Sequence, residues 1–298
     1  MRTRFKPDRG LTGRMLATTF LLGLLYVVFV ALLIALTKSA LVAVVIAGAL
    51  LFSQYWFSDR IALYAMHGRI VTPEEAPELH GVIDRLCALA DMPKPTVAIA
   101  DVDMPNAFAT GRSPNKAVLC VTTGILRRLD ANELEGVLAH ELSHIAHRDV
   151  AVMTIASFLG VLAGLTTRIG LWGGFGRSRD QNTTVVVLTV VLVSAVVYAV
   201  SFFLTRALSR YRELSADRAA AILTGHPSAL ASALTKVSGE IARIPSRDLR
   251  QAEAFNAFFF APALAPGLSL SSLFATHPPL ERRLDQLAGI ARELGEQG

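Results

Sequence analysis

Long uncharged runs interrupt segments of mixed polarity along this chain. A membrane-spanning helix needs about 20 consecutive, predominantly apolar residues, and four runs approach or exceed that length. They lie between Arg14 and Lys38, between Lys38 and Asp59, between Asp149 and Arg168, and between Asp180 and Arg206. The pattern therefore predicts four transmembrane or membrane-associated helices.

Basic residues beside these runs predict the orientation of the chain. The first run is followed at once by a second, and it is too long for the core of a cleaved signal, so we interpret it as an uncleaved anchor. Positive charges favour the cytoplasmic side. They precede the first run at Arg2, Arg4, Lys6, Arg9 and Arg14, and they follow the fourth at Arg206, Arg210 and Arg212. We expect a multi-pass protein of the cell (inner) membrane whose polar parts face the cytoplasm.

The third and fourth runs leave two arrangements open. The loop between them carries Arg168, Arg177 and Arg179. Two full spans would put this loop on the side where few positive charges are expected. The two runs therefore form either two full spans or a shallow, tilted hairpin.

The polar stretches between the runs define the domain organisation. We predict a two-helix membrane anchor at 1–58 and an apolar hairpin at 149–205. The remaining stretches, 59–148 and 206–298, are each short for an independent domain, so we expect them to fold together as one.

Composition and charge narrow the class of protein. Of the 298 residues, 52% are hydrophobic and 18% are charged, whereas soluble domains carry about 25% charged residues. The net charge of +5 is compatible with nucleic-acid binding, but the basic residues cluster beside the apolar runs, where anionic headgroups attract them. Membrane lipid is therefore the expected partner and nucleic acid is not. Cys87 and Cys120 lack metal-binding spacing, so we expect both to be buried and reduced.

The polar stretches predict a mainly α-helical fold with a small β-sheet, an α+β domain. A helix should open at Thr72-Pro73, because Thr72 can cap it and Pro73 fits its first position. Short runs rich in β-branched residues predict strands at 96–100 and 117–122. The segment between these strands, 106–111, is expected to be a loop.

The candidate chemistry lies on the next helix. Asp130 is a good N-cap, and Glu133 is placed to complete a capping box. Within the helix, His140 and His144 are four residues apart, so both imidazoles lie on one face and can bind a single Zn²⁺. Glu141 lies beside that face, where it can act as the general base toward a water molecule. The alternative is that these are two surface histidines with ordinary hydrogen bonds.

A catalytic zinc needs a third protein ligand and one open position. The metzincin pattern would place a histidine at position 150, but that residue is valine. Glu213 and Asp217 share a helix face in the second polar stretch, so we expect Glu213 to be a ligand and Asp217 to support a ligating histidine. The alternative is a solvated helix face with alternating charges.

Taken together, these motifs resemble the HtpX family of membrane zinc peptidases, gluzincins related to the CAAX prenyl peptidases. The resemblance rests on the H-E-x-x-H helix, the apolar runs and the E-x-x-x-D pair, and two further segments agree with it. These are Asn106-Ala107-Phe108-Ala109, and Thr276-His277-Pro278-Pro279-Leu280 followed by Arg283.

The resemblance implies a zincin-like catalytic domain with one Zn²⁺ per chain. It implies an endopeptidase of membrane-protein quality control and stress response, acting on misfolded or damaged membrane proteins that offer extended or unfolded segments. Asn106, Ala107, Phe108 and Ala109 would form a substrate-binding edge. His277 and Arg283 would act in catalysis by stabilising the oxyanion. A homo-oligomer stays open.

Two other functions remain compatible with the residues. The same fold could be a catalytically idle membrane scaffold or regulator, although the intact Glu141 argues against it. A transporter could carry the metal as cargo, because ionisable residues near spans often mark ion pathways. The apolar runs carry almost no charge, and the H-E-x-x-H motif lies outside them. We therefore expect a zinc-dependent endopeptidase.

Overall fold

The computed structural model divides the chain into two compact units. It describes residues 9–37, 48–49, 52, 56, 63–64, 66–111, 113–147, 181–243 and 277–295. The first unit draws its described residues from Met1–Leu11, Ser58–Ala151 and Ser209–Gly298, and the second draws them from Thr12–Phe57 and Val152–Leu208. Each unit is taken separately below.

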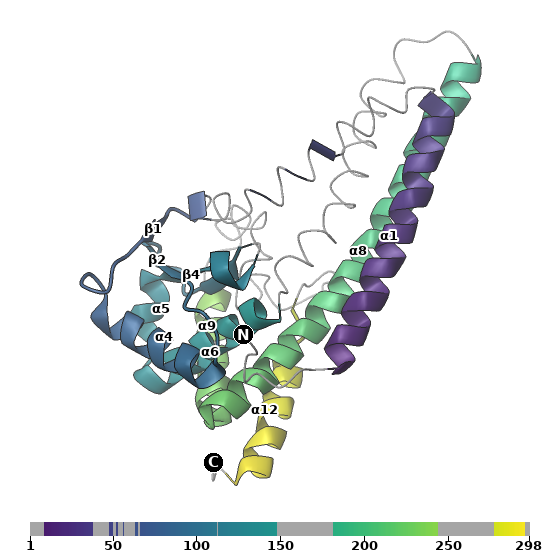
Figure 1. The fold of residues 1–298 in the computed structure, drawn as a ribbon. Helices are drawn as coiled ribbons and strands as arrows, with labels where there is room; N and C mark the ends of the chain where they lie inside the picture. Colours follow the sequence, from purple (N-terminus) through teal and green to yellow (C-terminus); the bar gives the residue numbers. More distant parts are fainter. Residues whose placement is uncertain are drawn as a thin grey trace. The chain divides into compact units, whose positions relative to one another are not determined.

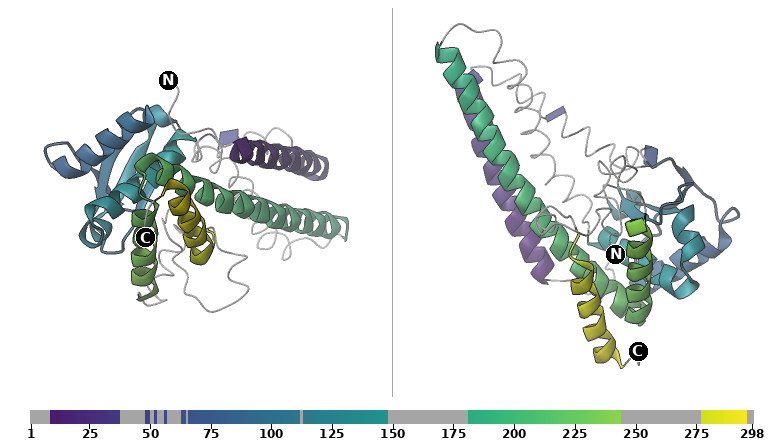
Figure 2. Two further views of the ribbon diagram at one scale, coloured as in Figure 1. Left: turned by 90° about the horizontal axis from the view of Figure 1, so that it is seen from below. Right: turned by 180° about the vertical axis from the view of Figure 1, so that it is seen from behind.

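Two long helices make up most of the described part of the second unit. Helix α1 (Arg9–Thr37) contains the first apolar run, and α8 (Gln181–Thr224) contains the fourth and continues into the first unit from Ser209. Their axes are roughly parallel (Figures 1 and 2). The third predicted run, and nearly all of the second, lie outside the described residues. Among the helices that are described, none has both the length and the apolar character that crossing a membrane requires.

The first unit is built on a four-stranded mixed sheet with the order β1-β2-β4-β3. Strand β1 (Gly68–Ile70) pairs antiparallel with β2 (Thr96–Ala100), which runs parallel to β4 (Val118–Thr122). Strand β3 (Ala107–Thr110) pairs antiparallel with β4 and aligns Phe108 with Cys120. Among the described strands β3 therefore forms one edge of the sheet.

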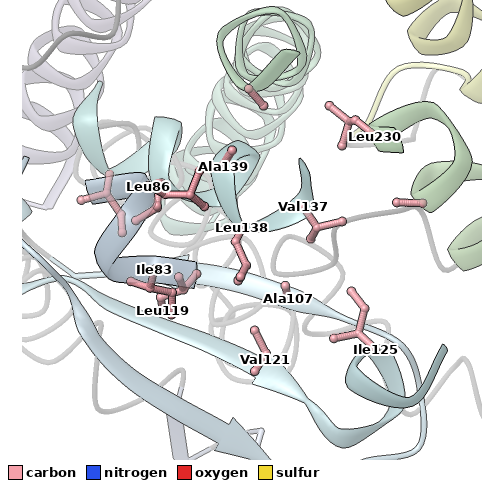
Figure 3. Packing of buried hydrophobic residues seen from close by; sticks show 14 of the residues in the cluster. Ile83, Leu86, Ala107, Leu119, Val121, Ile125, Val137, Leu138, Ala139 and Leu230 are labelled. Carbon is pink, nitrogen blue, oxygen red and sulfur yellow. The ribbon is translucent and has the colours of Figure 1, made fainter. Parts of the chain in front are cut away.

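The two faces of the sheet bury different sets of side chains, because successive residues of a strand point to opposite faces. One face meets helices α4 (Pro77–Ala90) and α6 (Ala131–Ala146) in the main core. Figure 3 shows Leu119 and Val121 of β4 beneath Ile83 of α4 and Leu138 of α6. The other face carries a smaller cluster: Met66, Ala98, Ala100, Phe108, Val118 and Cys120.

Helix α6 lies at the centre of this unit. Asp130 caps its first turn, and Glu133 completes the predicted capping box. Its other side packs against α9 (Pro227–Arg243), which in turn packs against α12 (Leu280–Leu294). The approach of α6 to α9 is close, because a Cβ on Gly136 would lie 3.3 Å from the Cα of Leu230.

The start of α4 differs from the sequence-based expectation. The predicted start at Thr72 is a separate turn, in which Glu75 Oε2 accepts the Thr72 N–H at 2.8 Å. The helix begins at Pro77, which disfavours helical geometry at the preceding residue, and Ala76 accordingly has φ −142° and ψ 62°. Pro77, not Pro73, occupies the first helical turn.

The predicted strands are present, but the loop expected between them is partly a strand. Strand β2 covers 96–100 as predicted, and β4 begins one residue later than predicted, at Val118. Residues 107–110 form β3, followed by the short 3-10 helix Pro114–Lys116. Helix α5 (Thr123–Arg128) follows β4 directly, and its N-cap is Thr122, whose side chain accepts the Ile125 N–H.

Candidate metal centre

Helix α6 presents three polar side chains on a buried surface. His140, Glu141 and His144 are all buried, with 1%, 4% and 6% exposure. The helix holds them at fixed spacing, because its capped first turn and the apolar residues around them pack against the sheet and α9. Buried imidazoles and carboxylates need polar partners or a metal.

Two carboxylates from α8 meet this surface. Glu213 and Asp217 lie one turn apart on the helix, with 5% and 0% exposure. Both contact His140: Glu213 Oε2 lies 3.4 Å from Nε2, and Asp217 Oδ1 lies 2.9 Å from Nδ1. The two nitrogens of one imidazole therefore face two different carboxylates.

The donor atoms of His140, His144 and Glu213 fit a tetrahedral metal ion. The two Nε2 atoms lie 3.2 Å apart. Glu213 Oε2 lies 3.4 Å from Nε2 of His140, and Glu213 Oε1 lies 3.4 Å from Nε2 of His144. Zinc bonds of 2.0–2.1 Å at tetrahedral angles would place neighbouring ligand atoms about 3.3–3.4 Å apart. With one ligand atom taken from each residue, the three buried donors lie within 4.8 Å of one another, which suits the protein ligands of a metal site with one open position.

Asp217 continues the arrangement away from these donor atoms. Arg283 of α12 donates to it from Nε at 2.7 Å and from Nη2 at 2.6 Å, and its side chain is 1% exposed. Burial opposes the negative charge of Asp217, but Arg283 and His140 hold the pKa of this carboxyl below its usual range. Asp217 is therefore a carboxylate shared by a guanidinium and an imidazole.

Glu141 is connected to the edge strand. The backbone N–H of Ala109 in β3 donates to Glu141 Oε2 at 3.0 Å. Burial is the largest influence on the Glu141 carboxyl and raises its pKa. A carboxyl whose pKa moves toward neutrality suits a general base better than one with an ordinary pKa.

His277 and Arg212 also lie beside the donor atoms. His277 Nδ1 lies 3.0 Å from Glu213 Oε2, and Arg212 Nη2 lies 3.5 Å from His144 Nδ1. Burial opposes ionisation of Glu213, but His277, His140 and His144 hold the pKa of the Glu213 carboxyl well below the usual range. The contact between Arg212 and His144 was not predicted from the sequence. The one signal in the sequence is that Arg212 directly precedes Glu213.

The four residues predicted to bind substrate occupy different environments. Asn106 is fully buried, and its backbone N–H and carbonyl both bond to Thr122. The Phe108 side chain packs in the cluster on the far face of the sheet. Because bonding to β4 alternates along an antiparallel strand, the backbone groups of Ala107 and Ala109 point to the outer edge. Any contact of this strand with a peptide therefore runs through backbone groups.

Comparisons with known proteins agree with this geometry. The profile described as Peptidase family M48 matches residues 73–291. Protease HtpX homolog 1 of Streptomyces coelicolor is 66% identical, over 99% of this chain and 98% of the relative. The Protease HtpX homolog of Moorella thermoacetica is 53% identical over the whole length of both chains. The Protease HtpX homolog of Pyrococcus furiosus is 41% identical, over 95% of this chain and 96% of the relative.

A solved structure shares the fold at lower identity. The crystal structure of S. mikatae Ste24p superposes with a TM-score of 0.55 at 20% identity, and the match covers 89% of this chain and 62% of that one. The HtpX relatives match along almost their whole length, and the family profile includes every candidate ligand. The chain therefore belongs to peptidase family M48 and is a metalloprotease of the HtpX type.

Proposed function

We propose that the chain is a zinc-dependent endopeptidase of the cell membrane that hydrolyses misfolded or damaged membrane proteins. The observation that carries this proposal is that the Nε2 atoms of His140 and His144 lie 3.2 Å apart and each lies 3.4 Å from a carboxylate oxygen of Glu213. Glu141 directly follows His140 in the chain. These three residues would hold one Zn²⁺, and Asp217 would support His140. When bound, the ion would polarise the scissile carbonyl and acidify water.

Glu141 is the proposed general base. Its carboxylate takes a proton from the attacking water as the oxygen bonds to the carbonyl carbon, and it later gives that proton to the leaving nitrogen as the C–N bond breaks. The Ala109 N–H holds Oε2, which fixes the orientation of the carboxylate. His277, a buried donor beside Glu213, is placed to stabilise negative charge that develops on the carbonyl oxygen.

The edge position of β3 supports substrates with extended segments. A peptide adds to an edge strand through its own backbone groups, and these are already paired in a folded helix or sheet. A misfolded or damaged protein exposes such segments, whereas its native form does not. The enzyme should therefore cleave an unfolded membrane protein much faster than the same protein in its folded state.

Membrane insertion and orientation belong to the same proposal. The four uncharged runs and the basic residues beside them support a multi-pass protein of the inner membrane, with residues 59–148 and 206–298 facing the cytoplasm. Fusing a reporter after residue 298 tests this orientation. Fluorescence of a cytoplasmic reporter is expected, and activity of a reporter that matures only outside the cytoplasm would contradict it.

The catalytic proposal is tested with Glu141→Gln in the purified, detergent-solubilised full chain. The variant should keep its zinc and lose at least about 100-fold in the rate of casein cleavage, because the base is gone and the ligands remain. Glu240→Gln is the matched control. Glu240 lies on α9 and forms an ion pair with Arg128 of α5, so this variant should cleave casein at the wild-type rate. Equal cleavage by wild type and Glu141→Gln would refute the assignment. An idle scaffold would show no cleavage by either protein.

A further inference from the structure

Helix α12 sends one fully buried guanidinium to the metal centre. Arg283 is 1% exposed, and its Nε and Nη2 atoms each bond one oxygen of Asp217. Its Nη1 atom lies 3.9 Å from Glu213 Oε2, beyond hydrogen-bond distance. The two-pronged contact with Asp217 is thus the principal interaction of this guanidinium with the carboxylates of α8.

The oxygen that binds Arg283 Nη2 also faces a candidate ligand. Asp217 Oδ1 lies 2.6 Å from Arg283 Nη2 and 2.9 Å from His140 Nδ1. On the opposite side of that imidazole, Nε2 faces His144 and Glu213. An unbroken chain of contacts therefore runs from α12 through Asp217 to the donor atom of His140.

A planar fork restricts a carboxylate more than a single bond does. Two parallel N–H···O contacts fix both the position and the rotation of the carboxylate. A carboxylate oriented in this way fixes the tautomer and the ring plane of the histidine that it faces. Without the guanidinium, the Asp217 side chain could rotate about two bonds and would hold the His140 ring less firmly.

We propose that Arg283 is a positioning residue for the metal: it orients Asp217, which in turn directs Nε2 of His140 toward the ion. The proposal rests on the proposed zinc site. It replaces the oxyanion contact expected for Arg283 from the family resemblance with an indirect role, and it makes the C-terminal helix part of the metal-binding structure.

The sign of the change in zinc affinity separates positioning from a simple charge effect. Removing a positive charge close to a cation strengthens cation binding by Coulomb's law. Releasing the carboxylate that orients a ligating histidine weakens zinc binding, by roughly 10–100-fold in comparable sites. A direct oxyanion role would leave zinc affinity unchanged and lower only the catalytic rate.

The experiment measures the zinc dissociation constant of the full chain in detergent by competition with a chromophoric chelator. Arg283→Gln and Arg283→Lys should both bind Zn²⁺ about 10–100-fold more weakly than wild type, because lysine keeps the charge but not the fork. Gln286→Ala is the matched control. Gln286 lies one turn further along α12 and bonds the Leu214 carbonyl at 2.6 Å, so its loss should leave zinc affinity unchanged.

Asp217→Asn supplies a second test, and as a single variant it does not depend on folding of the Arg283 variants. Because the two residues act in series, Asp217→Asn should weaken zinc binding, and adding Arg283→Lys should weaken it little further. Wild-type or tighter affinity in Arg283→Lys, or fully additive losses in the double variant, would overturn the proposal. A wild-type chain that binds no zinc would instead refute the proposed function.

Discussion

The backbone N–H of Ala109 donates to Oε2 of Glu141 at 3.0 Å, so the edge strand of the sheet is bonded to the proposed general base. Residues 32 positions apart in the sequence thus share one polar contact inside the first unit. This contact joins two proposed functions, strand pairing with an extended peptide and proton transfer. A change in β3 should therefore alter catalysis without altering metal binding.

Ala109→Pro tests this connection by removing the N–H. Proline is tolerated on an edge strand when its nitrogen faces away from the ladder, as that of Ala109 does. We expect kcat/KM for casein to fall by about 10-fold or more, because a charge-assisted hydrogen bond contributes ~1.5–3 kcal/mol. Ala109→Ser keeps the N–H and should cleave at nearly the wild-type rate. Wild-type kcat/KM in the proline variant would show that this bond is unimportant.

Glu133 should stabilise the α6–α9 packing that supports the metal centre. Its buried carboxylate completes the α6 capping box and accepts from Ser232 at 2.6 Å and Lys236 at 2.7 Å. Glu133→Ala removes the capping-box bond and both bonds to α9, so unfolding free energy should drop by about 2–3 kcal/mol. Chemical denaturation measures the change. A loss below about 0.5 kcal/mol would contradict it.

The contribution of Glu133 should also depend on pH. Burial opposes its charge, but Lys236, Ser232 and the Asp130 N–H outweigh burial and hold its pKa below the usual value. A lowered folded-state pKa stabilises the protein above the ordinary glutamate pKa, and the stabilisation disappears as pH falls through the folded-state value. The stability difference between wild type and Glu133→Ala should therefore shrink below about pH 4. A constant difference from pH 7 to pH 3 would contradict this assignment.

Gly124 should be irreplaceable at the start of α5. A Cβ there would lie 2.0 Å from the Asp103 carbonyl oxygen, and backbone atoms cannot give way as a side chain can. Gly124→Ala should destabilise the protein by at least about 2 kcal/mol and displace the segment that leads into β3. Gly81→Ala is the control, because that exposed α4 position is open and alanine should stabilise the helix by about 0.5–1 kcal/mol. Equal melting temperatures for the two variants would refute the packing argument.

Cys87 and Cys120 should resist alkylation in the folded protein. Burial raises the pKa of Cys87 to about 11 and that of Cys120 to about 12. The thiolate is the reactive form, and at pH 8 it would make up ~0.1% or less of either residue. Mass spectrometry after N-ethylmaleimide treatment should find no label in the folded chain and two labels after denaturation. Rapid labelling of the native protein would contradict the burial of both residues.

Local features of the fold were predictable from the sequence, because each depends on neighbouring residues. Asp130 and Glu133 predicted the start of α6, and the capping box is present. Strand β3 was missed because Ala-Phe-Ala-Thr lacks the β-branched run that identified 96–100. The predicted start of α4 was wrong because Pro77 disfavours helical geometry at Ala76, so the turn that begins at Thr72 does not continue into the helix.

In the candidate site too, relationships within one helix were predictable from the sequence, and contacts between distant residues were not. The pairs His140 with His144 and Glu213 with Asp217 follow from spacing within single helices. The contact between Asp217 and Arg283 joins residues 66 positions apart, and no local pattern indicates it. Sequence reasoning placed Arg283 near the metal only through a family resemblance, and the partner of its guanidinium comes from the three-dimensional arrangement of α8 and α12.

An anomalous difference map of zinc-loaded crystals, collected at the zinc absorption edge, tests the central claim most directly. We predict one strong peak in the first unit, about 2.0–2.2 Å from Nε2 of His140, Nε2 of His144 and a carboxylate oxygen of Glu213. A peak whose coordination excludes Glu213, or no peak beside the two imidazoles in protein that cleaves casein, would contradict the account.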